Sequence, residues 1–253
     1  NVVNQPLATI SASAATICAG ATTTLTANAG TGYTYSWSNG ASTQSIIVSP
    51  ATTATYTVTV TNSTGCSTTS AVQTITVNPA LTPIISGTAV VCAGTSTTLT
   101  ASSAIGTTPL TYVWSTGATS AAITVTPNAT TSYSVSITDA NGCTATSLVT
   151  TVTVNQLPVV NAGNDATICN GASTTLLATG ATNYVWSPST GLATTNTASV
   201  VASPTVTTTY TVTGTNANGC VDTDTVTVNV VNQPLATISA SAATICAGAT
   251  TTL

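Results

Sequence analysis

Apolar and polar residues alternate along much of this chain. The runs "YTVTVTN" at 56–62 and "QTITVN" at 73–78 place Val, Ile or Tyr at every second position and mostly Thr between them. A period of two is typical of a strand with one buried face and one face in water. Runs of this kind recur between Gly, Pro and Asn, and they predict an all-β chain made of short strands.

Asn-Gly pairs stand between some of these runs. Asn141-Gly142 and Asn218-Gly219 each separate two alternating stretches. Both residue types tolerate positive φ, which the tight turn of a two-stranded hairpin requires. Each pair therefore predicts a hairpin.

The chain is internally repetitive. Residues 1–25 recur letter for letter at 229–253, which is an offset of 228 residues, and Tyr56, Tyr133 and Tyr210 are 77 residues apart at each step. Self-similarity of this kind indicates repeated structural units. We expect the following division: 1–4, the end of a preceding module; 5–78, module 1; 79–155, module 2; 156–232, module 3; and 233–253, the start of a further module identical to 5–25.

Each module has the size and hairpin pattern of an immunoglobulin-like antiparallel β-sandwich, with six or seven strands of four to eight residues. We expect the sandwiches to follow one another end to end. Aromatic residues recur at matching positions and are the candidate core. Trp would lie on strand C, and Tyr near the start of strand F would form a tyrosine corner, its hydroxyl bonded back to the backbone. These core residues are Trp37, Trp114, Trp186, Tyr56, Tyr133 and Tyr210.

Composition excludes several functions. The chain has no Lys, Arg or His, and four Asp are its only charged side chains. Without cations it has no means of neutralising nucleic-acid phosphates or of binding an anionic membrane surface. No apolar run reaches the roughly 18 residues of a membrane-spanning helix. Asp222 and Asp224 could form a carboxylate pair, but no His, Lys or Glu is present to assist acid–base chemistry. We expect neither an enzyme nor a cofactor.

A metal site is not expected either. The chain has no Cys-x-x-Cys motif and no His, which argues against zinc. Calcium sites gather several oxygen ligands, whereas Asp139 and Asp165 stand at different landmarks of their modules. The Asp residues are expected in turns or on the surface.

Seven cysteines are present, two in each module plus Cys246. They predict disulfides and an oxidising compartment. Pairing within modules would join Cys18 to Cys66, Cys92 to Cys143 and Cys169 to Cys220. Pairing between neighbouring modules would join Cys18 to Cys143 and Cys92 to Cys220, while Cys66 would bond a preceding module and Cys169 and Cys246 following ones.

The second pattern is favoured. The first cysteine of a module lies at the turn between strands A and B, and the second follows the F–G hairpin at the opposite end of the sandwich. About nine residues of strand F, at 3.3 Å each, keep those ends roughly 30 Å apart. A disulfide requires Cα atoms within about 7 Å. The pairing within modules stays open where the assignment of strand A is uncertain.

The frame "NAGNDATICNG…YVWSPSTGL…TTTYTVTGTNANGC" at 161–220 resembles the Ig-like and PKD-like tandem repeats of secreted surface proteins of Bacteroidota, which include gliding-motility adhesins and type IX secretion products. The resemblance covers all three modules. It implies an extracellular or cell-surface location and no catalytic residue. Asp224-Thr225-Val226 resembles an O-glycosylation acceptor of that bacterial group, with Thr225 as the modified residue.

Two functions are compatible with these features. The first is a structural array that forms an extracellular fibre, filament or stalk, stiffened by disulfides, whose partners are neighbouring modules or further copies. The second is an adhesin in which loops or terminal domains bind glycans or other cells. The first is favoured because the loops offer few aromatic residues and no cation.

Overall fold

The structure is a computed structural model that describes residues 4–239, 241, 244–250 and 252. The described residues form strands and turns and contain no helix, so the prediction of an all-β chain is confirmed. They divide into two compact units, one up to Val154 and one from Asn155 onward. The first unit contains modules 1 and 2, and the second contains module 3.

Module 1 is a sandwich of two layers. One layer is the sheet β1-β3-β5, and the other consists of the sheets β2-β9-β6 and β4-β7-β8. The second layer is continuous because one residue separates β6 from β7 and three separate β8 from β9. The strands are β1 (Ile10–Ala12), β2 (Thr16–Cys18), β3 (Thr23–Ala27), β4 (Thr34–Trp37), β5 (Ser45–Val48), β6 (Ala54–Tyr56), β7 (Val58–Thr61), β8 (Ser67–Thr69) and β9 (Gln73–Asn78).

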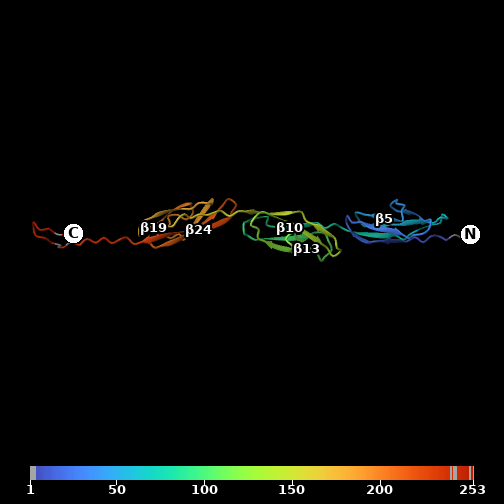
Figure 1. Ribbon diagram of the computed structural model, residues 1–253, viewed down its shortest axis with the longest axis horizontal. Coiled ribbons are helices and arrows are strands. Elements are labelled where there is room, and N and C mark those ends of the chain that lie inside the picture. Colours follow the sequence, from blue (N-terminus) through green and yellow to red (C-terminus); the bar gives the residue numbers. More distant parts are fainter. Residues whose placement is uncertain (1–3, 240, 242–243, 251, 253) are drawn as a thin grey trace. The chain divides into compact units, whose positions relative to one another are not determined.

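Module 2 repeats this arrangement. The sheet β10-β12-β14 forms one layer, and β11-β18-β15 with β13-β16-β17 forms the other, so β10 and β13 lie in different layers (Figure 1). The strands are β10 (Pro83–Gly87), β11 (Val90–Cys92), β12 (Thr97–Ser103), β13 (Thr111–Trp114), β14 (Ala122–Val125), β15 (Thr131–Tyr133), β16 (Val135–Thr138), β17 (Thr144–Thr146) and β18 (Thr150–Asn155).

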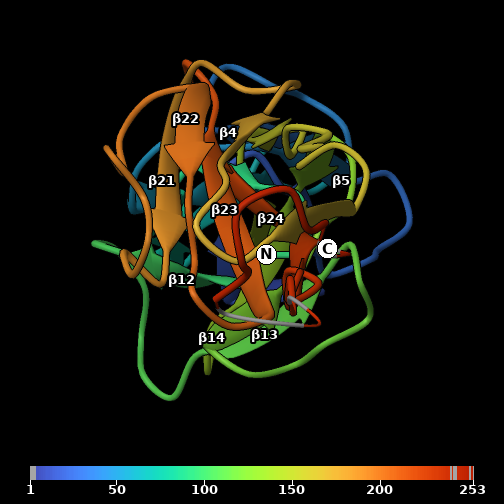
Figure 2. The same ribbon diagram turned by 90° about the vertical axis from the view of Figure 1, so that its left-hand side faces the viewer.

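Module 3 has the same two layers with longer strands. The sheet β19-β24-β23-β21 faces β20-β22, and an isolated bridge between Asn161 and Thr179 extends the second layer. The two longest strands, β23 and β24, lie side by side (Figure 2). The strands are β19 (Ala166–Cys169), β20 (Thr174–Leu177), β21 (Asn183–Ser187), β22 (Ser199–Ala202), β23 (Thr208–Thr215) and β24 (Val221–Val231).

Alternating burial along the strands produces these layers. In β3 and β23 the buried positions fall on every second residue, and their partners on the other face are half-buried or exposed Thr. The buried side chains gather in three separate clusters, one for each module. Each cluster has one Trp at its centre, so the three predicted modules each have a hydrophobic core of their own.

The strand that ends at the first cysteine of a module pairs in parallel with the last strand of that module. In module 1, Thr16–Cys18 pairs with Thr76–Asn78, and in module 3, Ala166–Cys169 pairs with Val228–Val231. The sequence analysis predicted only antiparallel pairs. The parallel pair brings the first cysteine of the module to the end of the strand through which the chain leaves.

The Asn-Gly pairs do form hairpins, but not in the predicted conformation. Gly142 and Gly219 each have φ of 79°, whereas no described residue other than glycine has positive φ. The turn is closed by the N–H of Gly142 donating to the carbonyl of Asp139, at 3.0 Å, and the same bond joins Gly219 to Asn216. These hairpin turns are longer than the two-residue turn that was predicted, and they need positive φ only at the glycine.

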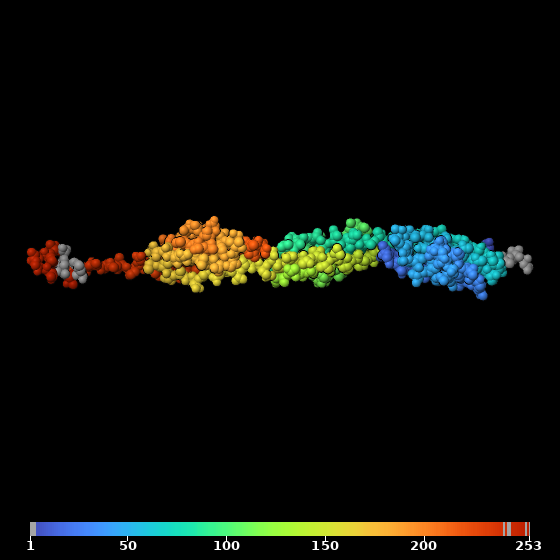
Figure 3. Space-filling model, turned by 90° about the horizontal axis from the view of Figure 1, so that it is seen from above, coloured from blue at the N-terminus to red at the C-terminus, as the bar shows by residue number. Residues whose placement is uncertain are grey.

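The repeated 25-residue segment adopts two structures. Residues 5–25 supply β1, β2 and the start of β3, and Ile17 is 7% exposed. Among the described residues of 233–253 there is no strand, and Ile245, the equivalent of Ile17, is 46% exposed. In Figure 3 a narrow red stretch of the chain projects from the end of module 3. Residues 1–3 and parts of 233–253 belong to predicted flanking modules and lie outside the described residues.

Candidate functional site: the cysteine turns

The second cysteine of each module is held by an acceptor side chain four residues before it. Oδ1 of Asn62, Asp139 and Asn216 accepts the backbone N–H of Cys66, Cys143 and Cys220, at 3.0, 2.9 and 3.0 Å. The same oxygen also accepts the N–H two residues after the acceptor. Three different modules therefore present this cysteine from one turn geometry, named here the entry turn.

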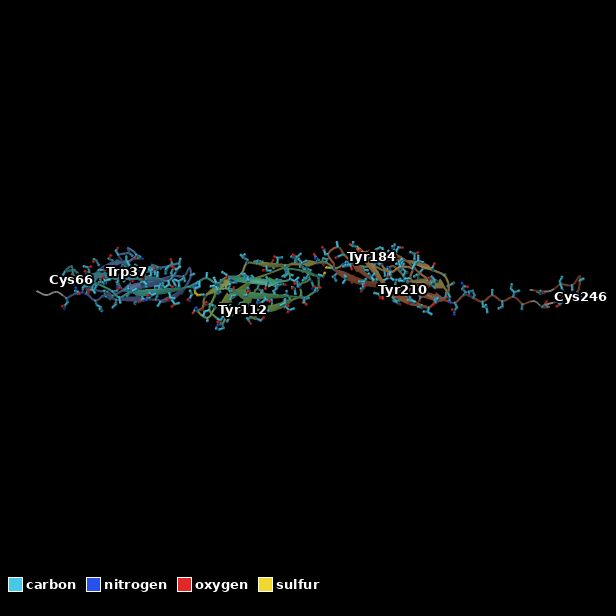
Figure 4. All side chains as sticks on the ribbon, turned by 180° about the vertical axis from the view of Figure 1, so that it is seen from behind. Trp37, Cys66, Tyr112, Tyr184, Tyr210 and Cys246 are labelled. Carbon is cyan, nitrogen blue, oxygen red and sulfur yellow. A yellow bond between two sulfur atoms is a disulfide. The ribbon has the colours of Figure 1, made fainter. Side chains whose placement is uncertain are left out.

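The entry turn lies where the chain enters its module. Nδ2 of Asn62 donates to the carbonyl of Asn4 at 3.2 Å, and Nδ2 of Asn216 donates to that of Gln156 at 2.9 Å. Both carbonyls belong to the segment that precedes the first strand. In Figure 4, Cys66 lies at one end of module 1, away from Trp37 in its core.

The first cysteine of each module ends a strand at the opposite end, in what is named here the exit turn. The carbonyl of Cys18 accepts the N–H of Ala21 at 2.9 Å, and the carbonyl of Cys169 accepts that of Ala172 at 2.9 Å. The neighbouring N–H of Ala19 donates to Asn78, and that of Asn170 donates to Val231, the last residues of β9 and β24. The exit turn is thus fixed to the strand through which the chain leaves.

Cys18 and Cys143 are joined by a disulfide across a sequence separation of 125 residues, with 5.6 Å between their Cα atoms. The bond connects the exit turn of module 1 to the entry turn of module 2. It is the pairing that the sequence analysis favoured, and Cys18–Cys66 and Cys92–Cys143 are excluded here because Cys18 and Cys143 are bonded to each other. The two cysteines of one module lie at opposite ends of its sandwich, which is why Cys18 bonds a cysteine of the neighbouring module instead of Cys66.

The other cysteines fall into two groups. Cys92 and Cys220 are also disulfide-bonded. Cys66, Cys169 and Cys246 are free thiols, and Cys169 and Cys246 are exposed. Cys169 is therefore not bonded to Cys220, the last of the pairs predicted within modules.

The three predicted core Trp are buried and equivalent. Trp37, Trp114 and Trp186 are 3%, 2% and 2% exposed. Each indole N–H donates to a backbone carbonyl in the loop that follows the strand of that Trp (β4, β13 or β21), at 2.7, 2.8 and 3.0 Å. An indole needs a partner when it is buried, and this shared bond fixes the loop against the core.

One of the three predicted corner tyrosines, Tyr210, has its hydroxyl bonded back to the backbone as expected, but over more residues than in a tyrosine corner. Tyr133 and Tyr210 are buried and Tyr56 is half-buried against its core. The hydroxyl of Tyr210 donates to the carbonyl of Thr190, which is 20 residues upstream in the loop before β22. A bond to a nearer upstream carbonyl comes from Tyr184 on β21, which is labelled in Figure 4, and whose hydroxyl donates to the carbonyl of Ala181 at 2.8 Å.

The Asp residues accept backbone hydrogen bonds. Asp139 is buried, and the N–H groups of Thr107, Cys143 and Asn141 lower the pKa of its carboxyl. Asp224 accepts the N–H of Ala162 at 2.8 Å, which lowers its pKa in the same way. Asp165 accepts the N–H of Thr227 at 2.8 Å. These bonds hold loops and strand ends in place, and Asp139 has the turn role expected of it.

Asp224 and Asp222 lie on the same side of β24 as the buried Val226, and both are half-buried. Thr225, the residue after Asp224, is exposed and stands opposite Thr211 on β23. The outward position predicted for Thr225 is therefore present.

No other chemistry gathers at these turns. In the part of the chain that the structure describes, no three His, Cys, Asp or Glu side chains stand close enough to hold a metal ion. The same residues include no helix capable of crossing a membrane.

No family model matches the chain, and no curated protein matches it in sequence. Solved structures resemble it weakly. A structure from work on host cell surface retention of a bacterial ice-binding adhesin is 15% identical, covers 90% of this chain and 100% of its own, and has a TM-score of 0.34. A Ca²⁺-stabilized adhesin of an Antarctic bacterium is 18% identical, with coverage of 91% and 75% and a TM-score of 0.37. The insect immune protein hemolin is 14% identical, with coverage of 89% and 77% and a TM-score of 0.27. These values are too low to indicate a function.

Proposed function

We propose that this chain is part of an extracellular structural array, a fibre or stalk of Ig-like modules in which each joint is closed by a disulfide. The single observation that carries the proposal is the Cys18–Cys143 bond, because it connects successive modules instead of stabilising one. A bond of this kind limits how far two modules can separate under load. It does nothing for a loop-based binding site.

The repeat supports the same bond at further joints. Cys92 ends β11 as Cys18 ends β2, and Cys220 sits in the same entry turn as Cys143. Both are disulfide-bonded. Cys92 and Cys220 are therefore proposed as the pair between modules 2 and 3.

An oxidising location follows from this use of cysteine, since disulfides persist in secreted and surface proteins. The resemblance to secreted surface repeats of Bacteroidota supports the same location, and Thr225 is retained as the candidate glycan acceptor. The partners proposed are neighbouring modules and further copies of the repeat. The glycan-binding alternative is less favoured because the loops offer few aromatic residues and no cation.

Single-molecule stretching tests the mechanical role. A variant carrying C92S and C220S isolates the Cys18–Cys143 bond. The 125 residues between these cysteines, at about 3.4 Å each, correspond to about 430 Å of contour length that the bond withholds from extension. Adding a reductant should release this length once modules 1 and 2 have unfolded.

A second variant with C18S and C143S added to the same background is the control. It should give the longer contour length with and without reductant. An extension that reductant does not change in the first variant would contradict an array restrained by disulfides.

A further inference from the structure

The two ends of the three-module segment carry complementary free cysteines. Cys66 occupies the entry turn of module 1, and Cys169 occupies the exit turn of module 3. An entry turn and an exit turn are the two partners that meet in the Cys18–Cys143 bond. Each of these free thiols therefore has the geometry of one half of a joint.

The geometry of each half matches its bonded counterpart closely. The N–H of Cys66 is bonded to Asn62 at 3.0 Å, as that of Cys143 is to Asp139 at 2.9 Å. The turn bond at Cys169 has the same length, 2.9 Å, as the one at Cys18. Both free cysteines therefore lie in turns with the same hydrogen bonds as their bonded counterparts.

Both free cysteines are more accessible than their bonded counterparts. In the bonded pair, Cys143 is buried and Cys18 is half-buried. At the matching free positions, Cys66 is only half-buried and Cys169 is exposed. A facing turn can therefore reach each free thiol.

The sequence indicates which turn should face Cys169. Residues 233–253 follow module 3 and are identical to 5–25, the residues that open module 1. The entry turn of module 1 carries Cys66. We propose that Cys169 forms a disulfide with Cys66 of another copy of the repeat, which makes the partner of this chain a second copy of itself, joined head to tail.

This inference rests on the proposed array and names the joint between its repeats. The bond forms when the two thiols lose two protons and two electrons. A small disulfide such as oxidised glutathione takes up the electrons and is reduced to two thiols by exchange. Cys246 is also exposed, but its exit turn is not attached to a last strand, so it serves as a control.

The test uses the 253-residue chain in two variants that each keep one free thiol. C66S with C246S keeps Cys169, and C169S with C246S keeps Cys66. The first variant is labelled with heavy nitrogen, the two are mixed in equal amounts in a glutathione redox buffer, and the disulfide-linked dimers are weighed by intact mass spectrometry. We expect the mixed dimer in several-fold excess over its share under random pairing.

The chain with all its cysteines should form a ladder of multiples on a denaturing gel without reductant, and C246S alone should leave that ladder unchanged. Mixed and like dimers in random proportions, or a ladder that survives C66S, would overturn the Cys66–Cys169 pairing. Such a failure would leave the Cys18–Cys143 stretching result intact, so the two proposals fail separately.

Discussion

Oδ2 of Asp139 accepts a hydrogen bond from the backbone N–H of Thr107, at 3.1 Å. At the same position of the entry turn in module 1, Asn62 does the reverse, because its Nδ2 donates to the carbonyl of Asn4 at 3.2 Å. The carboxylate thus stands where the turn faces a donor, and the amide stands where it faces an acceptor. Asn216 follows the second pattern with Gln156.

The carboxylate of Asp139, in place of the amide found in the other two modules, predicts that module 2 is sensitive to acid. The bonds to Asp139, led by that of Thr107, lower the pKa of its carboxyl from an ordinary value of 3.8. A lowered pKa stabilises the folded state above that ordinary value, and this contribution is lost as the pH falls through the folded-state pKa. Module 2 should therefore lose stability below about pH 3.8. Amide NMR peaks assigned to each module and followed during acidification would measure this.

Module 1 is the internal control, because residues 5–78 contain no Asp or Glu. Its peaks should persist to lower pH than those of module 2. Module 3 should also be acid-sensitive, since the N–H of Ala162 lowers the pKa of Asp224. Simultaneous loss of all three modules would show that the Asp bonds do not decide acid stability.

Exchanging the two residue types should be unfavourable in both directions. Asp139→Asn would turn an amide donor toward the N–H of Thr107, and Asn62→Asp would turn a carboxylate toward the carbonyl of Asn4. We expect Asn62→Asp to cost about 1 kcal/mol at neutral pH, the value of one hydrogen bond. Urea unfolding at pH 7 would measure it. Unchanged midpoints in both variants would mean that these bonds are dispensable.

Substituting Trp186 should lower the stability of module 3 far more than substituting its neighbour on the same strand. Trp186 is 2% exposed at the centre of module 3, whereas the adjacent Val185 is 56% exposed. Trp186→Ala should cost about 3–5 kcal/mol through lost burial and a cavity. Val185→Ala should stay within about 0.5 kcal/mol of the parent. Far-UV circular dichroism during urea unfolding gives both values, and similar midpoints would place the core elsewhere.

The disulfide predicts a stability effect limited to the modules it joins. Closing a loop of 125 residues is worth about 5 kcal/mol on the chain-entropy model. The double variant C18S, C143S should therefore destabilise modules 1 and 2 by up to this amount and leave the peaks of module 3 unchanged during denaturation. The double variant C66S, C169S removes two free thiols and serves as the matched control, with no change expected in the monomer.

The sequence predicted what local pattern determines. The alternation of apolar and polar residues predicted where strands form. The recurrence of Trp at equivalent positions predicted the three cores. The length of strand F predicted that the two cysteines of one module lie too far apart to bond. Contacts between groups far apart in the sequence could not be predicted from local pattern. The residues around Tyr210 give no sign of its bond to Thr190, and the parallel pairing of β2 with β9 depends on the path of the whole module.

The direction of the hydrogen bonds at the entry turn could not be predicted from the sequence either. Asn62, Asp139 and Asn216 each stand four residues before the second cysteine of their module. Which of them faces a donor depends on the loop that packs behind the turn, and that loop differs between modules. In module 2 it contributes the N–H of Thr107, whereas in modules 1 and 3 the entering segment contributes a carbonyl.

The duplicated segment tests how far local sequence decides packing, because its two copies are identical in sequence. Ile17 is 7% exposed and belongs to the core of module 1, whereas Ile245 is 46% exposed and lies outside any strand. Ile17→Ala should cost about 2–5 kcal/mol, since it removes buried methyl groups. Ile245→Ala should change stability by no more than about 0.5 kcal/mol. Urea unfolding of the two variants compares one substitution in one local sequence and two environments. Equal costs would mean that residues 233–253 pack as residues 5–25 do, and an Ile245→Ala cost above that of Ile17→Ala would indicate that the second copy has displaced the first from the module 1 core.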